Sequence, residues 1–266
     1  MCAICGCSGS MKKEDHDHTH EHEHAHGHHD HDHSHDHDTL HAAHEHGSSK
    51  TLLLEKEVLA KNDLVAARNR GWLEGRSILA LNVMSSPGAG KTTLLERTIA
   101  ELGEVPISVI EGDQATARDA ERIRSAGARA LQINTGTGCH LDAQMIADGL
   151  RRLELASPSL LVIENVGNLV CPALFDLGER FKVVVVSVTE GDDKPLKYPH
   201  MFRAAGILVL NKIDLLPHVS FDTARFLEFT RRINPRLRIF EVSATRGDGI
   251  DAWCHWLKSG VGAAIP

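Results

Sequence analysis

The chain lacks a long hydrophobic run. No segment of its 266 residues reaches the roughly 18 apolar residues that a membrane-spanning helix needs, and the run 183–188 has only the length of a strand. The N-terminus has no apolar stretch resembling the core of a secretory signal. We therefore expect neither a membrane helix nor export, and we expect a cytosolic protein.

The chain also lacks an excess of positive charge. Residues 1–50 contain ten acidic and only three basic side chains, which accounts for the whole formal net charge of −7. The other residues carry 26 basic and 26 acidic groups and are formally neutral. A nucleic-acid partner would require a basic surface, so none is expected.

Cysteine is scarce, but half of it is concentrated at one end. Three of the six cysteines lie within the first seven residues, as Cys2, Cys5 and Cys7. Without an export signal a disulfide framework is not expected, and metal binding gains weight. Thiolates with amine or amide nitrogens suit square-planar Ni²⁺, and thiolates also accept Zn²⁺. The alternative is a redox-labile terminus without function.

A histidine tract follows this terminus. Fifteen of the nineteen histidines lie between His16 and His46, largely alternating with Asp and Glu. With almost no apolar residues, residues 1–50 are predicted to be a disordered extension. Neutral imidazoles without fixed geometry predict loose binding and storage of Ni²⁺; a solubilising tail or a purification tag are the alternatives. The storage ligands would be His16, His18, His20, His22, His24, His26, His28, His29, His31, His33, His35 and His37.

Residues 51–266 predict one α/β domain with an N-terminal helix over residues 51–76. Several of its strands are continuous apolar runs, as expected for parallel strands covered on both faces, and helical patterns follow most of them. This alternation predicts a doubly wound, mostly parallel sheet. The predicted strands are 78–84, 107–111, 130–134, 160–164, 183–189, 207–211 and 239–243, and the predicted helices are 92–102, 117–125, 143–155 and 221–233.

A phosphate-binding loop, "SSPGAGKTT", follows the first strand and opens a helix. The backbone N–H groups of Gly88, Ala89 and Gly90 would hold phosphates at the helix N-terminus. Lys91 would reach the β- and γ-phosphates, and the hydroxyl of Thr92 would bind Mg²⁺. The next residue, Thr93, would also belong to the nucleotide-binding site. Ser85 stands where the motif usually has its first glycine.

A second motif, "NKID", indicates guanine rather than adenine. Asn211, Lys212 and Asp214 end a later strand, and Ser243 and Ala244 end the next one. The Asp214 carboxylate can accept two hydrogen bonds from the N1 and N2 edge of guanine, and adenine offers no such donor pair. GTP is therefore favoured over ATP.

Acidic residues at strand ends would complete the catalytic and Mg²⁺ site. The candidates are Asp113, Asp119 and Glu164, and Gly167 would let the backbone approach the γ-phosphate. For Asp119 in particular, a helix cap or a solvated loop residue is the alternative. No arginine finger or catalytic glutamine is evident, which predicts a GTPase with a slow intrinsic rate, as in a molecular switch.

A second group of soft ligands lies inside the domain. Cys139 and His140 follow the third strand, and Cys171 lies four residues beyond Gly167. Two thiolates and an imidazole form an incomplete set for a four-coordinate ion, which two chains around a twofold axis could complete or share. A buried, inert cysteine is the alternative for Cys171. The sixth, Cys254, is expected to pack in the core.

The chain closely resembles the HypB family of hydrogenase nickel-incorporation GTPases. The likeness covers nearly the whole length, through "CAICGC", the histidine tract, "KNDLVAARNR", "SSPGAGKTT", "NTGTGCHLD", "ENVGNLVCP", "TEGDDKP" and "NKIDLL". It implies a dimerising GTPase that delivers Ni²⁺ to the large subunit of [NiFe] hydrogenase, with a small zinc-containing accessory protein as partner. It also implies a high-affinity nickel site at Cys2, Cys5 and Cys7, and a nickel or zinc site at Cys139, His140 and Cys171.

Two other functions remain open. One is a nickel or zinc store in which the G domain only regulates assembly. The other is a urease-type nickel-chaperone GTPase, which shares the P-loop but is expected to lack the Cys-rich terminus and the cysteine of "ENVGNLVCP".

Overall fold

The computed structural model describes residues 41–113, 118–136 and 138–263, with the backbone alone for residues 41–55. The chain divides into two compact units, residues 1–57 and 58–266. The predicted ligands Cys2, Cys5 and Cys7 and the histidines from His16 to His37 lie outside the described residues.

The second unit is built on a seven-stranded sheet in which every pair of neighbouring strands is parallel. The strand order is β3-β2-β4-β1-β5-β6-β7, so the chain crosses from one half of the sheet to the other after β4. This confirms the predicted doubly wound α/β fold. The strands are β1 Ile78–Ser85, β2 Ile107–Asp113, β3 Arg129–Asn134, β4 Ser159–Glu164, β5 Phe181–Ser187, β6 Ile207–Asn211 and β7 Arg238–Glu241.

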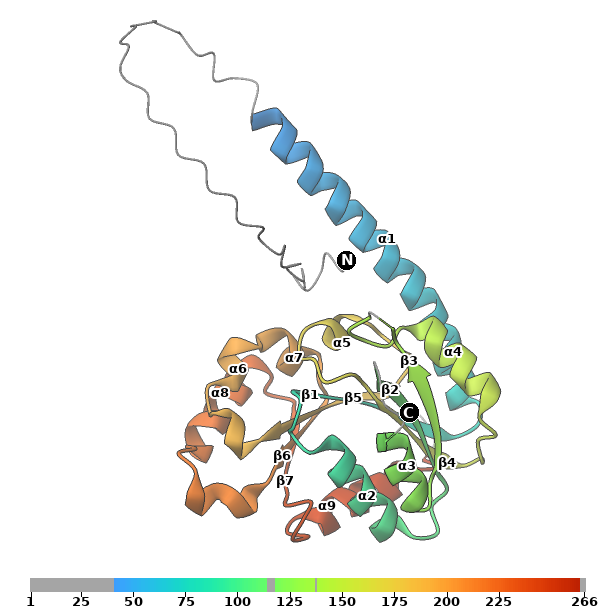
Figure 1. The fold of residues 1–266 in the computed structure, drawn as a ribbon, viewed down its shortest axis with the longest axis vertical. Helices are drawn as coiled ribbons and strands as arrows, with labels where there is room; N and C mark the ends of the chain where they lie inside the picture. The colour runs from blue at the N-terminus through green and yellow to red at the C-terminus, as the bar shows by residue number, and fades with distance from the viewer. Residues whose placement is uncertain (1–40, 114–117, 137, 264–266) are drawn as a thin grey trace, which may run out of the picture. The chain divides into compact units, whose positions relative to one another are not determined.

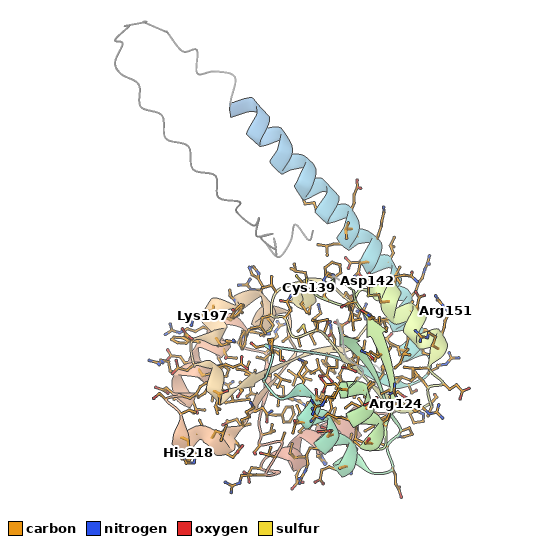
Figure 2. All side chains as sticks on the ribbon, viewed as in Figure 1. Arg124, Cys139, Asp142, Arg151, Lys197 and His218 are labelled. Carbon is orange, nitrogen blue, oxygen red and sulfur yellow. The ribbon has the colours of Figure 1, made fainter. Side chains whose placement is uncertain are left out.

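Helices cover both faces of the sheet (Figure 1). One face packs against α2 (Lys91–Leu102), α3 (Arg118–Ser125) and α9 (Ile250–Gly260). The other packs against the end of α1 (His41–Glu74) and against α4 (Ala143–Arg152), α5 (Cys171–Leu174), α7 (Pro199–Ala204) and α8 (Thr223–Ile233). Side chains fill the space between these layers (Figure 2). As predicted, Cys254 packs in the core beside Trp253.

The N-terminal helix α1 begins ten residues earlier than predicted, at His41 instead of residue 51. Ala42 and Ala43 are strong helix formers, and extending an existing helix costs far less than nucleating one. The last ten residues of the predicted disordered extension are therefore helical in the structure. No helix among the described residues is long and apolar enough to cross a membrane.

Short helical segments were not predicted. These are α5, α6 (Lys194–Lys197) and α7, and the 3₁₀ turns Val188–Glu190 and Ile213–His218. The 3₁₀ turn at Val188 ends β5 two residues before the predicted end of that strand. Helices of one turn are shorter than the window over which a 3.6-residue period can be recognised.

Within the second unit, buried asparagines attach α1 to the sheet. Asn69 is 4% exposed and donates to the backbone oxygens of Ala143 (2.8 Å) and Leu177 (3.1 Å). Asn62 accepts from the N–H of Ala143 (2.9 Å) and donates to the oxygen of Asp176 (2.7 Å). Helix α1 therefore holds the start of α4 and the loop between α5 and β5 in fixed positions.

Gly178 is where α1 comes closest to that loop, and Gly178→Ala is expected to destabilise the fold by about 2–4 kcal/mol. Its φ is +92°, and a Cβ would lie 2.7 Å from the oxygen of Ala66 and 2.8 Å from the nitrogen of Arg70. The matched control is Gly127→Ala, because Gly127 has a φ of +104° but open space around it. Chemical denaturation should show a clearly larger loss for Gly178→Ala, and equal losses would contradict this packing.

Candidate functional site

The P-loop links the end of β1 to the start of α2. Gly90 has a φ of +94°, and a Cβ there would lie 2.6 Å from Nδ2 of Asn211, so only glycine fits. The loop borders an open cleft of about 610 Å³ at the carboxyl ends of the strands. The cleft is lined by Pro87, Gly88, Gly90, Lys91, Thr92, Thr93, Asp119, Arg122, Glu164, Val166, Gly167 and Lys212.

Ser85 holds the P-loop lysine in place. Nζ of Lys91 donates to Oγ of Ser85 over 2.9 Å. Burial lowers the pKa of Lys91, and the nearby carboxylate of Glu164 opposes that shift. The serine at the motif's first glycine position thus orients the ammonium group that faces the cleft.

Thr92 and Glu164 form a buried pair suited to Mg²⁺. The Thr92 hydroxyl donates to Oε1 of Glu164 over 3.0 Å, and Oε2 of Glu164 is buried without a partner. Burial raises the pKa of Glu164, against the effects of Lys91 and Thr92. A hydroxyl beside a buried carboxylate with an unused oxygen fits a hard cation with oxygen ligands.

The two other acidic candidates, Asp119 and Asp113, lie in different elements. Asp119 lines the cleft and pairs with Arg122 over 3.3 Å. Asp113 is the last residue of β2, but its side chain lies outside the described part, so its role as a Mg²⁺ ligand stays a prediction.

The residues predicted to recognise guanine come together at the ends of β6 and β7. Oγ of Ser243 donates to Oδ1 of Asp214 over 2.5 Å, which orients the carboxylate. Asn211 donates to the oxygen of Ala89 (3.0 Å) and accepts from the N–H of Ala244 (3.2 Å). Nζ of Lys212 donates to the oxygen of Gly88 (2.8 Å). Asn211 and Lys212 therefore tie the base site to the P-loop.

Sequence analysis missed Arg122, which also lines the cleft. Its guanidinium binds both carboxylate oxygens of Glu96 (2.9 and 2.6 Å) and Oγ1 of Thr93 (3.3 Å). The Glu96 hydrogen bonds raise the pKa of Arg122 despite partial burial. An arginine among charged helix residues looks like a solvated face in sequence, so no pattern could have identified it.

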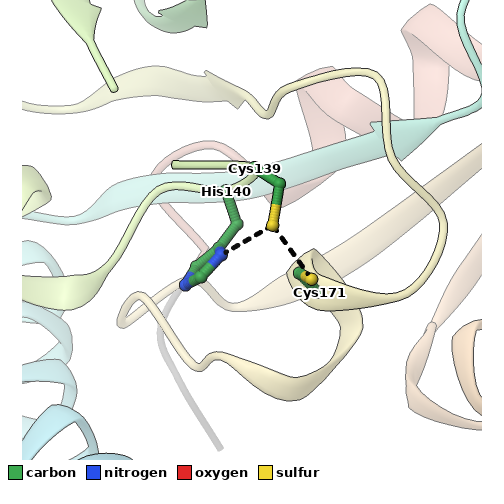
Figure 3. A group of neighbouring side chains, drawn as sticks. All are labelled: Cys139, His140 and Cys171. Atoms are coloured by element: carbon green, nitrogen blue, oxygen red, sulfur yellow. Dashed lines mark hydrogen bonds between the residues drawn. The ribbon is translucent and has the colours of Figure 1, made fainter. Parts of the chain in front are cut away.

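Cys139, His140 and Cys171 form a compact group of metal-ligating atoms (Figure 3). Sγ of Cys139 lies 3.1 Å from Sγ of Cys171 and 3.6 Å from Nδ1 of His140, and all three ligand atoms lie within 4.8 Å of one another. Cys171 is fully buried, and Asp142, two residues after His140 in the chain, caps α4. The loop after β3 and the short helix after β4 therefore bring the predicted ligands together.

The chemistry of this group fits a soft divalent ion. The imidazole of His140 packs against Phe175 with ring centroids 4.0 Å apart and the ring planes tilted by 32°, and burial lowers its pKa, which favours the neutral ligand form. Two sulfurs bound to one tetrahedral ion at about 2.3 Å lie about 3.8 Å apart, so the thiols need to separate by less than about 1 Å. Among the described residues this group supplies three ligands, one fewer than a tetrahedral ion takes.

Comparison with known proteins agrees with this geometry. The family model "CobW/HypB/UreG, nucleotide-binding domain" matches residues 79–241. The hydrogenase maturation factor HypB of Escherichia coli K12 is 56% identical over 219 residues, covering 81% of this chain and 76% of its own length. The hydrogenase/urease maturation factor HypB of Helicobacter pylori J99 is 41% identical over 214 residues, covering 79% and 88%.

Two solved structures share the fold. HypB from Archaeoglobus fulgidus has a TM-score of 0.71 and 44% identity, covering 76% of this chain and 98% of its own. HypB from Helicobacter pylori, solved in complex with nickel, has a TM-score of 0.72 and 39% identity, covering 75% and 95%. The chain belongs to the HypB family, within the CobW/HypB/UreG group of nucleotide-binding domains.

Proposed function

We propose that this chain is a GTP-hydrolysing nickel metallochaperone for the maturation of [NiFe] hydrogenase, in which the nucleotide state sets the metal affinity of Cys139, His140 and Cys171. The observation that carries this proposal is the position of Cys171. It lies four residues after Gly167, which lines the nucleotide cleft, and its sulfur lies 3.1 Å from that of Cys139. A movement at the γ-phosphate would therefore shift one ligand relative to the other two.

In the nucleotide site, Lys91 and the P-loop N–H groups would bind the phosphates, and Asp214 would bind the guanine. Thr92 and Glu164, with Asp113 as a third candidate, would hold Mg²⁺, which when bound neutralises phosphate charge. Asp119, which lines the same cleft, would be a further acidic residue of the catalytic site. Since Glu96 engages Arg122 through both carboxylate oxygens, a slow intrinsic rate is expected.

The remaining parts of the proposal rest on the family resemblance. Cys2, Cys5 and Cys7 would form a high-affinity nickel site, and the histidine tract of residues 1–50 would store Ni²⁺ ahead of the domain of residues 51–266. The internal site would take Ni²⁺ or Zn²⁺. The chain would dimerise on GTP or metal binding and work with the hydrogenase large subunit and a small zinc-containing accessory protein.

The test is the nickel affinity of the internal site in two nucleotide states. Full-length protein with Cys2, Cys5 and Cys7 replaced by Ser would be titrated with Ni²⁺ against a chelator, reading the nickel–thiolate absorption. We expect the Kd values with GDP and with a non-hydrolysable GTP analogue to differ by about 5–150-fold, the usual range for such coupling. Equal values would leave metal storage with a regulatory G domain as the better description.

A further inference from the structure

Two asparagines flank Gly167 along the chain, and both side chains reach the metal-binding loop. Oδ1 of Asn165 accepts from the N–H of Leu141 over 3.1 Å. Nδ2 of Asn168 donates to the oxygen of Cys139 over 3.3 Å. The segment around Gly167, which borders the nucleotide cleft, therefore contacts the backbone of the residues on both sides of His140.

Asn165 is a fixed anchor. It is 1% exposed, and its Oδ1 also accepts from the N–H of Val166 over 3.0 Å. Its Nδ2 donates to Asn82 over 3.2 Å, and Asn82 donates over 3.2 Å to the carboxylate of Glu179. Both asparagines and Glu179 are buried, so Asn165 is held in a network whose disruption would leave several polar groups without partners.

Asn168 is less constrained and joins both halves of the metal centre. It is partly exposed, and its Oδ1 accepts from the N–H of Val170 over 2.9 Å. Val170 immediately precedes α5, whose first residue is Cys171. One side chain therefore contacts the backbone beside Cys171 and, through its other end, the backbone of Cys139.

We propose that Asn165 and Asn168 are the positioning residues that transmit the state of Gly167 to the metal centre, with Asn165 as the fixed contact and Asn168 as the moving one. Gly167 packs against the P-loop, since a Cβ there would lie 3.1 Å from Cγ of Pro87. When Gly167 shifts toward or away from a γ-phosphate, Asn165 stays in its buried network and Asn168 follows its neighbour. Leu141 then keeps its position, whereas the segment that carries Cys171 moves and Asn168 displaces the Cys139 backbone, which changes the distances between the ligands.

This inference rests on the proposed function and names the residues that produce the coupling. The test uses the same full-length protein with Cys2, Cys5 and Cys7 replaced by Ser. In Asn168→Ala the ratio of nickel Kd values between GDP and the GTP analogue should fall to within about twofold of one, from the parent's expected 5–150-fold. By reciprocity, Ni²⁺ should also lose its effect on the affinity for the GTP analogue.

Asn134→Ala is the matched control. Asn134 ends β3 just before the same loop, and its Oδ1 accepts from the N–H of Gly136 over 2.7 Å, a local bond that does not reach the segment around Gly167. We expect this variant to keep the parent ratio. Asn168→Asp is the second variant, because it retains an acceptor for Val170 and removes the donor to Cys139; its added negative charge acts in both nucleotide states, so its ratio should also fall toward one.

The outcomes separate the two claims. If the parent shows equal nickel affinities in both states, the proposed function fails. If the parent ratio is large and Asn168→Ala or Asn168→Asp keeps it, even with weaker binding in both states, the relay is wrong and the proposed function stands. A ratio lost equally in Asn134→Ala would also overturn the assignment, since any disturbance of the loop would then suffice.

Discussion

Replacing Asp214 by Asn is expected to lower the affinity for guanine nucleotides by about 10⁴–10⁵-fold, the penalty for losing matched hydrogen bonds in a specific site. The structure orients this carboxylate through the 2.5 Å hydrogen bond from Ser243. In guanine, N1 and N2 both donate, and the amide of Asn would place its own N–H₂ group against one of those donors. Xanthine carries an oxygen at position 2, so the same amide can donate to that oxygen and accept from N1.

The measurement is equilibrium binding of labelled GDP and of xanthosine diphosphate to parent and variant. Asp214→Asn should bind the xanthine nucleotide more tightly than the guanine nucleotide, reversing the parent's preference. Asp222→Asn is the control, because it makes the same change of charge eight residues away, where Asp222 caps α8 and Asn caps equally well. A variant that still preferred guanine would show that Asp214 does not bind the base.

Much of the fold could be predicted because its strands are buried on both faces. Every residue of β1 and of β4 is buried, so both strands are mostly apolar, with Asn82 as the polar exception inside β1, and both end at polar residues, Ser85 and Glu164, that belong to the site. All seven predicted strands form, and no strand begins or ends more than two residues from its predicted position. The short helices α5 to α7 could not be predicted in the same way, since tertiary contacts rather than a helical period define them.

The residues of the site also fall into two groups, those that the sequence could predict and those that it could not. Lys91, Thr92 and Asp214 could be predicted because phosphate and base binding require particular side chains at fixed positions of a motif, and Glu164 could be predicted because it ends a buried strand. Arg122, Asn165 and Asn168 could not, because their roles depend on contacts with backbone or side chains from elsewhere in the fold. The 74-residue separation between Asn69 and its acceptor in Ala143 illustrates the same limit.

Removing the Cys171 thiol is expected to weaken nickel binding at the internal site by about 10²–10³-fold. Metal-binding free energies of about 10–16 kcal/mol over four ligands correspond to about 2.5–4 kcal/mol for each one. Cys171→Ala should leave the fold of α5 intact, because Lys182 holds its end by donating to the oxygens of Ala173 (2.9 Å) and Phe175 (2.8 Å). The nickel–thiolate absorption per bound ion should fall as one of its two sulfurs is lost.

Cys254→Ala is the matched control, because it removes another buried thiol, one that lies outside the group of metal-ligating atoms found among the described residues. Burial raises the pKa of Cys254 to about 11, which keeps it a thiol, and it packs beside Trp253 in the core. We expect its nickel Kd to stay within about twofold of the parent, with both proteins lacking Cys2, Cys5 and Cys7. Because Cys171 shares its segment with Gly167, Cys171→Ala should also abolish the effect of Ni²⁺ on the affinity for the GTP analogue. If Cys171→Ala bound nickel like Cys254→Ala, the internal cluster would not be the metal centre, and the nucleotide would have no ligand to move.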